Sequence, residues 1–234
     1  WVFSAQAQLL PFIDQTNLQN KLDFSVPPLT FGFLPQATGN EQIAGTNVPS
    51  FLCPSDVAGV QGSRYGGVSY PACAGSGLAA GGWVEEADGI IYARSNTRIR
   101  DISESLFGSG NNTTGTTPEN AARQVIELPM GMVTTDASCA PNAGTAWSGQ
   151  RGGKWINGHY ADTIYNHYYP PNSELPDCHN GFHNYALTAA RSRHSGGVQV
   201  ALCDGSVHFI SESINPNIWH GLATRQGSEV LGEF

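Results

Sequence analysis

The chain carries the stretch Arg191-Ser-Arg-His-Ser-Gly-Gly-Val-Gln-Val-Ala-Leu-Cys-Asp-Gly-Ser-Val-His-Phe-Ile210, in which Asp204-Gly205 separates two runs of alternating apolar residues. Such alternation is typical of a strand with one buried face. Asp-Gly between two such runs favours a two-residue type I′ turn, because both turn positions need a positive φ. The sequence therefore predicts a β-hairpin over residues 197–211.

A two-residue turn also predicts the register of this hairpin. Leu202 would face Val207, and Val200 would face Phe209. Together with Val198, these residues would then share one face of the hairpin, so the apolar pattern and the turn agree. We expect that shared face to be the buried one.

Outside the hairpin the signals come from proline, glycine and short apolar runs. Proline fits the first turn of a helix, where its missing N–H forfeits no hydrogen bond. Short apolar runs next to turn residues predict strands. We expect helices over 11–22, 118–128 and 216–224, and strands over 48–53, 68–73, 90–93 and 98–102. A loop insertion is expected over about 137–178. All of these elements belong to one predicted domain spanning 1–234.

Several short motifs resemble a planctomycete family. Nine residues separate His194 from Asp204-Gly205, which is similar to the C-terminal His-x9-Asp-Gly motif of planctomycete prepilin-like proteins. Those proteins have a cleaved and methylated N-terminus and a domain of unknown function, and they are related to type IV pilins and to type II secretion pseudopilins. Similar stretches cover most of the chain: Gln8–Gln15, Phe51–Asp56, Ala72–Ser76, Asp88–Tyr92, Pro170–Ser173 and Thr224–Val230.

The resemblance implies a pilin-like α+β fold, in which an antiparallel β-sheet is enlarged by loops. It also implies a structural subunit of an extracellular or cell-envelope filament, which self-associates into a homopolymer and is not an enzyme. The family pattern opens with a basic leader and a long apolar anchor helix, and this sequence, which begins at Trp1, contains neither. We therefore expect copies to meet through globular loops, over residues 108–117 and 140–172.

The spacing of His194 and Asp204 argues against catalysis by this pair. An acid–base pair must come within hydrogen-bond reach. A strand over residues 198–203 rises about 3.3 Å per residue and so keeps the two side chains about 17 Å apart. We interpret Asp204 and Gly205 as turn residues, His194 as a loop or packing residue, and the motif as a folding signature.

The composition is poor in charge and rich in glycine, with 13% charged residues, 28 glycines and a net charge of −8. Average domains carry about 25% charged residues. Lys21 and Lys154 are the only lysines, which argues against a phosphate-binding surface and against nucleic acid as a partner. No apolar run is long enough to span a membrane. This composition is typical of an exported, loop-rich β protein.

The chain has five cysteines, and none forms a Cys-x-x-Cys motif of zinc or redox sites. In an exported protein, an odd number is most simply two disulfides and one thiol. We pair Cys53 with Cys73, which end two predicted strands, and Cys139 with Cys178, which lie in the predicted loop insertion. Cys203, in the hairpin, is then left as the thiol.

Two groups of residues offer metal ligands. His179 and His183 have the spacing of a zinc site on a helix, but Gly181 between them argues against a helix, so we expect them to pack in a loop. Acidic turn residues suit calcium instead, because calcium takes oxygen ligands. The related pseudopilins carry a calcium site in a C-terminal loop, and we name Asp88 and Asp204 as candidate calcium ligands.

Many aromatic residues fall in predicted loops: Trp83, Trp147, Trp155, Tyr160, Tyr165, Tyr168 and Tyr169. Such side chains can cover a thin sheet, stack on glycans or pack on a partner. Two alternatives to the filament subunit therefore stay open. One is a cell-surface carbohydrate-binding module that uses these aromatics, and the other is a metal-dependent hydrolase that uses the histidines.

Overall fold

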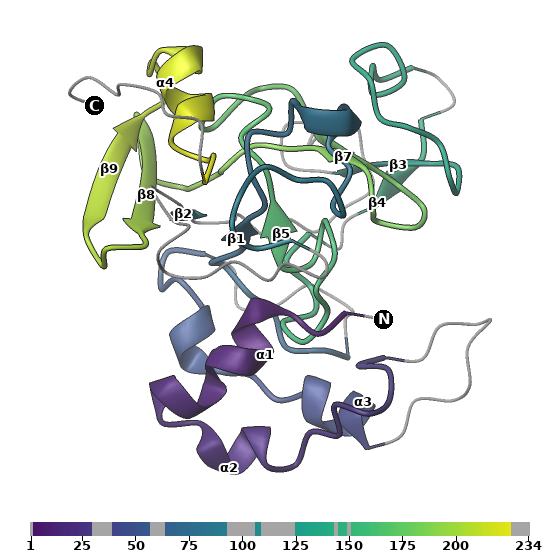
Figure 1. Ribbon diagram of the computed structural model, residues 1–234, viewed down its shortest axis with the longest axis vertical. Coiled ribbons are helices and arrows are strands. Elements are labelled where there is room, and N and C mark those ends of the chain that lie inside the picture. Colours follow the sequence, from purple (N-terminus) through teal and green to yellow (C-terminus); the bar gives the residue numbers. More distant parts are fainter. Residues whose placement is uncertain are drawn as a thin grey trace.

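The computed structural model describes residues 2–29, 39–56, 64–92, 106–108, 125–142, 145–148 and 151–225. Within them the fold is α+β, as predicted, with short helices and two small β-sheets (Figure 1). The N-terminal helices lie below the sheets in this view, and a hairpin of β8 (Gly197–Leu202) and β9 (Val207–Ser211) forms one side of the molecule.

Among the described residues, the larger sheet has five strands in the order β5-β1-β2-β8-β9. Strands β1 and β5 run parallel, and the other neighbours are antiparallel. Strand β9 therefore forms one edge of this sheet among the strands that the structure describes. The remaining three strands are β1 (Ala72–Cys73), β2 (Leu106–Gly108) and β5 (Ile164–Tyr165).

In the part of the chain that the structure describes, the smaller sheet has four strands in the order β4-β3-β6-β7. Its central pair, β3 and β6, is parallel, so residues far apart in the sequence lie side by side. The flanking pairs are antiparallel. The bounds of these strands are β3 (Val125–Leu128), β4 (Trp147–Ser148), β6 (Asp177–Asn180) and β7 (Ala186–Leu187).

The helices are all short: α1 (Ala5–Leu9), η1 (Leu10–Ile13), α2 (Thr16–Gln19), α3 (Asn40–Ala44), η2 (Pro49–Phe51), η3 (Ala79–Gly81) and α4 (Pro216–Gly221). The continuous helix predicted over 11–22 is wrong, because Asp14 at φ 60° ends η1 in the left-handed conformation. Ser4 caps α1, its Oγ accepting from the N–H of Ala7 at 3.0 Å.

Three other predicted elements differ from the structure. The strand expected over 48–53 is replaced by η2. Residues 90–92 form bends and no strand, and the helix expected over 118–128 is strand β3 in its described part. In each case the apolar run is too short for its period to decide between helix, strand and turn. The strand expected over 98–102 lies outside the described residues.

The hairpin stands where it was predicted, but its register is shifted by one residue. Val207 faces Ala201 and Phe209 faces Gln199, because the turn is a three-residue loop with Gly205 at φ 87°. A shift of one residue turns every side chain of a strand to the other face. Val207 and Phe209 are therefore 66% and 47% exposed, where we expected them to be buried.

The segment 137–178 was expected to be a loop insertion, but it supplies β4, β5 and part of β6. It also supplies much of the core. Trp155 and Ile156 pack with the N-terminal helices, whereas Tyr165 packs under the hairpin against Trp219. The segment is rich in Gly and Asn, which is typical of loops, and its buried aromatic residues are not regularly spaced. Its burial was therefore not predicted from the sequence.

Candidate metal centre

The two ends of the His-x9-Asp-Gly motif do not meet in the structure. His194 is exposed before β8, and its backbone N–H donates to Ser192 Oγ at 2.9 Å. Asp204 is exposed in the turn after β8, where its Oδ1 accepts from the N–H and Oγ of Ser206 at 2.8 and 2.7 Å. The two residues therefore lie at opposite ends of β8, and Gly205 supplies the left-handed turn residue.

One of the two predicted disulfides is present: Cys139 is bonded to Cys178, which lies in β6. The predicted Cys53–Cys73 bridge is wrong, because both residues remain thiols. Cys73 lies in β1 with its side chain fully buried, and burial raises the pKa of its thiol to about 12. Cys203 is also a thiol and is exposed beside the turn.

The two calcium candidates serve turns in this structure. Asp88 accepts from the backbone N–H of Ser76 through Oδ1 at 2.7 Å and from Ser76 Oγ through Oδ2 at 2.5 Å. Gly75 makes this approach possible, because a Cβ there would lie 2.0 Å from Asp88 Oδ1. Within the described ranges, neither Asp88 nor Asp204 belongs to a group of converging metal-type ligands.

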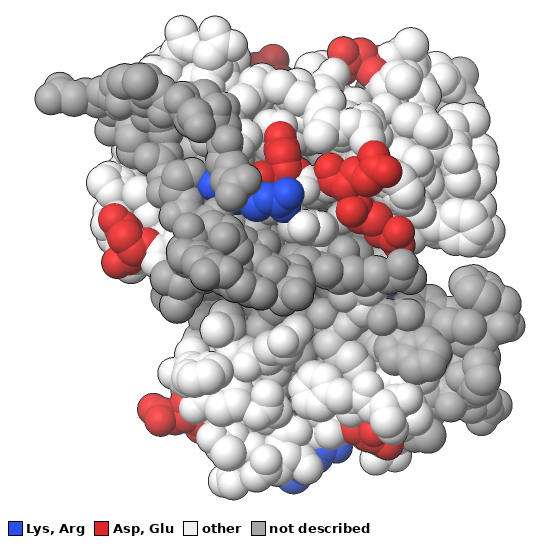
Figure 2. Space-filling model, in the orientation of Figure 1, with Lys and Arg blue, Asp and Glu red and all other residues white. Residues whose placement is uncertain are grey.

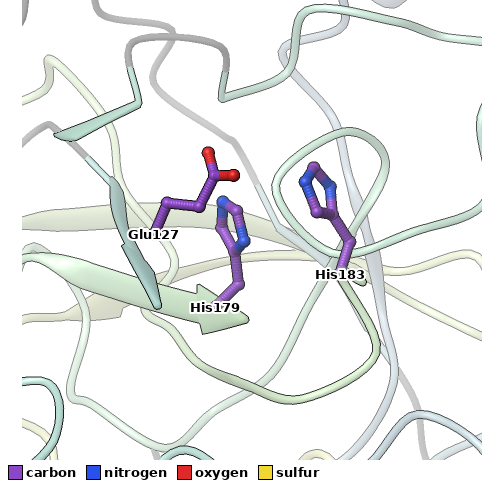
Figure 3. Close-up of side chains that lie close together, drawn as sticks. All are labelled: Glu127, His179 and His183. Atoms are coloured by element: carbon purple, nitrogen blue, oxygen red, sulfur yellow. The ribbon is translucent and has the colours of Figure 1, made fainter. Parts of the chain in front are cut away.

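A different group does converge: Glu127, His179 and His183, whose ligand atoms all lie within 4.8 Å of one another. Glu127 and His179 are register partners in the neighbouring parallel strands β3 and β6, so their side chains leave the same face of the sheet. His183 follows in the loop after β6. Figure 3 shows Glu127 and His179 side by side, with His183 across from them.

His179 is the buried member of this group, with 1% of its surface exposed. Its Nδ1 lies 2.9 Å from the carbonyl oxygen of Asn180. A carbonyl only accepts, so Nδ1 carries the proton and the neutral ring keeps a lone pair on Nε2. Within the described part of the chain that Nε2 is buried with no hydrogen-bond partner, which is uncommon for a polar atom in a folded protein.

His183 faces His179 with 4.2 Å between the ring centroids. Burial is the largest of the effects that lower the pKa of His183 to about 2, and the neighbouring His179, Lys154 and His159 lower it further. The pKa of His179 is also lowered, again mainly by burial. Both rings are therefore neutral near pH 7, which is the form that coordinates metals.

The backbone of His183 is strained, because its φ of 56° lies in the left-handed region. Two hydrogen bonds hold it there: its N–H donates to Asn180 O at 2.8 Å, and its carbonyl accepts from the N–H of Tyr160 at 3.3 Å. Strain of this kind is found where the surrounding structure fixes a functional side chain.

Glu127 also borders a surface cleft of about 450 Å³, which lies between β3 and residues 138–142 and 145–146. The Glu127 carboxylate is exposed, so the group reaches solvent at this residue although His179 is buried. Sequence reasoning found the two histidines but missed Glu127, because this residue was assigned to a helix. The missing information was the parallel pairing of β3 with β6, which joins segments about fifty residues apart.

A family model for proteins described as "Protein of unknown function (DUF1559)" matches residues 1–217. The chain belongs to this family. No curated protein and no solved structure matches the chain. Within the described residues, no helix is long and apolar enough to cross a membrane.

Proposed function

We propose that this chain is a pilin- or pseudopilin-like structural subunit of an extracellular or cell-envelope filament, and that copies associate through the β8–β9 hairpin. The observation that carries the proposal is the edge strand β9, which presents exposed apolar side chains beside backbone groups that pair with no strand among the described residues. The resemblance to prepilin-like proteins and the α+β fold agree with this function.

The backbone of β9 is arranged to accept another strand. Leu202 N–H donates to Ser206 O at 2.9 Å, and antiparallel pairing alternates along the hairpin. That alternation directs the backbone N–H and C=O of Val207 and Phe209 away from β8, toward the edge that no described strand pairs with. Edges of this kind pair with strands of other chains unless they are blocked.

A groove of about 340 Å³ extends the apolar surface from the hairpin to the N-terminal helices. Leu9 and Ile13 line it on one side, and Ala201 and Val207 on the other. Figure 2 shows acidic side chains and fewer basic ones scattered among uncharged residues on the face that it draws. Apolar surface on a soluble chain commonly marks an interface.

We place the proposed contacts at this hairpin and no longer in the loops expected from the sequence. Residues 140–172, which we predicted to lie between copies, are mostly buried in their described part. Residues 109–117 lie outside the described ranges. Among the aromatics, Trp155, Tyr160 and Tyr165 are core residues with at most 1% exposure, so they offer no platform for a glycan.

Sedimentation velocity and electron microscopy of the purified chain test the proposal. We expect concentration-dependent polymers that Phe209→Lys weakens at least tenfold, because a charge on an edge strand blocks strand pairing. Val133→Lys is the matched control, since Val133 is also 46% exposed but lies outside the hairpin. A monomer at all concentrations, with or without calcium, would rule out polymerisation by this domain. Equal assembly of Phe209→Lys and wild type would rule out contacts through the hairpin.

A further inference from the structure

The group of Glu127, His179 and His183 lies outside the hairpin through which we propose that copies associate. We propose that these three side chains bind one Zn²⁺ ion, which ties the loop after β6 to strands β3 and β6. This site does not depend on the filament proposal, and its test does not require assembly.

The ligand atoms already lie close to the geometry of a zinc site. They are within 4.8 Å of one another, and zinc ligands at about 2.1 Å in a tetrahedral site are about 3.4 Å apart. Side-chain rotations that move the ligand atoms by about an ångström bring them from the observed spacing to the tetrahedral spacing. Glu127 provides most of that freedom, because its carboxylate is exposed while its backbone is fixed by the pairing with His179.

His179 supplies a coordinating atom that is prepared for a metal. Asn180 O fixes its tautomer, as carbonyl groups commonly do for metal-bound histidines. The buried Nε2 has no hydrogen-bond partner in the described structure, and such an unsatisfied acceptor is costly to the fold. A bound ion would satisfy that atom.

The set of donors selects the class of ion. Two imidazole nitrogens and one carboxylate match the ligands of zinc and its neighbours in the first transition series. Calcium binds through oxygen alone, so this group is unsuitable for it. Three protein ligands leave the fourth position to water, and the cleft beside Glu127 gives the ion a route from solvent.

Cobalt and zinc titrations of the untagged, chelator-treated chain provide the test. We expect one Co²⁺ per chain, with the d–d absorption of tetrahedral coordination and stoichiometric displacement by Zn²⁺. Glu127→Gln and His183→Asn should each weaken binding by about 100-fold or more, because even outer partners of a metal ligand are worth about 10–100-fold. Asn is chosen at position 183 because it tolerates the left-handed conformation.

His194→Gln is the matched control, because it removes an exposed histidine from outside the site and should leave affinity unchanged. Circular dichroism of each variant checks that the fold is retained, and Glu127→Gln alters only an exposed side chain. Absence of the Co²⁺ absorption in wild type would overturn the site. Unchanged affinity in both ligand variants, or an equal loss in His194→Gln, would overturn it as well.

Discussion

Arg191 and Asp177 form a buried ion pair that joins the start of the hairpin segment to β6. Nε and Nη2 of Arg191 lie 3.2 and 2.9 Å from the same oxygen, Asp177 Oδ1. The other oxygen, Oδ2, pairs with Arg151. Asp177 is thus the shared anion of two buried guanidinium groups, both almost inaccessible to solvent.

Neutralising Asp177 should therefore destabilise the fold strongly. We expect Asp177→Asn to lower the free energy of unfolding by about 3–5 kcal/mol, because two buried cations lose their counterion. Urea denaturation followed by circular dichroism measures this change. Glu174→Gln, which removes an exposed carboxylate nearby, should change stability by less than about 0.5 kcal/mol. Equal effects of the two substitutions would contradict the role given to Asp177.

His167 should make the fold sensitive to acid. Its ring stacks on Trp219 with 3.4 Å between the ring centroids, and its Nδ1 and Nε2 lie 2.7 Å from Trp219 O and 3.0 Å from Tyr165 Oη. Burial is the main cause that lowers the pKa of His167 to about 3, whereas the pKa of an unfolded histidine is about 6.5. Its contribution to stability is complete above pH 6.5 and is lost as pH falls toward 3, because the unfolded chain takes up the proton first.

The measurement is the free energy of unfolding as a function of pH. Between pH 6 and 4 we expect His167→Gln to remove a slope of up to about 1.4 kcal/mol per pH unit that the wild type shows. His183, with its pKa lowered in the same direction, keeps part of the slope in the variant. An unchanged slope would show that His167 does not resist protonation in the folded chain.

Two glycines of the hairpin should respond differently to alanine. Gly205 has φ 87°, and a Cβ added there would meet nothing within 4 Å, so Gly205→Ala brings backbone strain alone, about 1–2 kcal/mol. A Cβ on Gly197 would lie 2.1 Å from Ile210 O, which forces β8 and β9 apart. Gly197→Ala should therefore be the more destabilising in urea denaturation, and the reverse order would contradict the observed register.

The disulfide between Cys139 and Cys178 should contribute substantially to stability. These cysteines are separated by 39 residues, and closing a loop of that length is worth about 4 kcal/mol in the chain-entropy model. The double substitution by Ser should lower the free energy of unfolding by about that amount. Mass spectrometry of an unreduced digest should find this bridge with Cys53 and Cys73 as thiols. A Cys53–Cys73 peptide would contradict the structure.

Local patterns located the hairpin but not its register. Asp204-Gly205 marks the turn correctly, yet two- and three-residue loops both suit this pair, and only the packing of Val198, Val200 and Ile210 selects between them. The exposure of Val207 follows from that choice. It could not be obtained from the alternation alone.

The sequence predicted only part of the candidate metal centre, for a similar reason. His179 and His183 are close in sequence, and their spacing alone raises metal binding as a hypothesis. Glu127 joins them only through the parallel register of β3 and β6, and the sequence around it carries no period that distinguishes strand from helix. The burial of Trp155 was likewise not predicted, because its neighbours in the sequence are mainly glycines and polar residues typical of loops.

The topology of the larger sheet sets the order in which the chain can fold. Ala72 pairs with Ile164, and Phe107 with Ala201, so loops of roughly ninety residues must close before these contacts form. The β8–β9 hairpin is local and can form within microseconds. Until β2 pairs with β8, both edges of the hairpin are unpaired, so strand pairing between molecules competes with folding. Refolding yield should therefore fall with protein concentration, while the rate for the molecules that do fold stays constant.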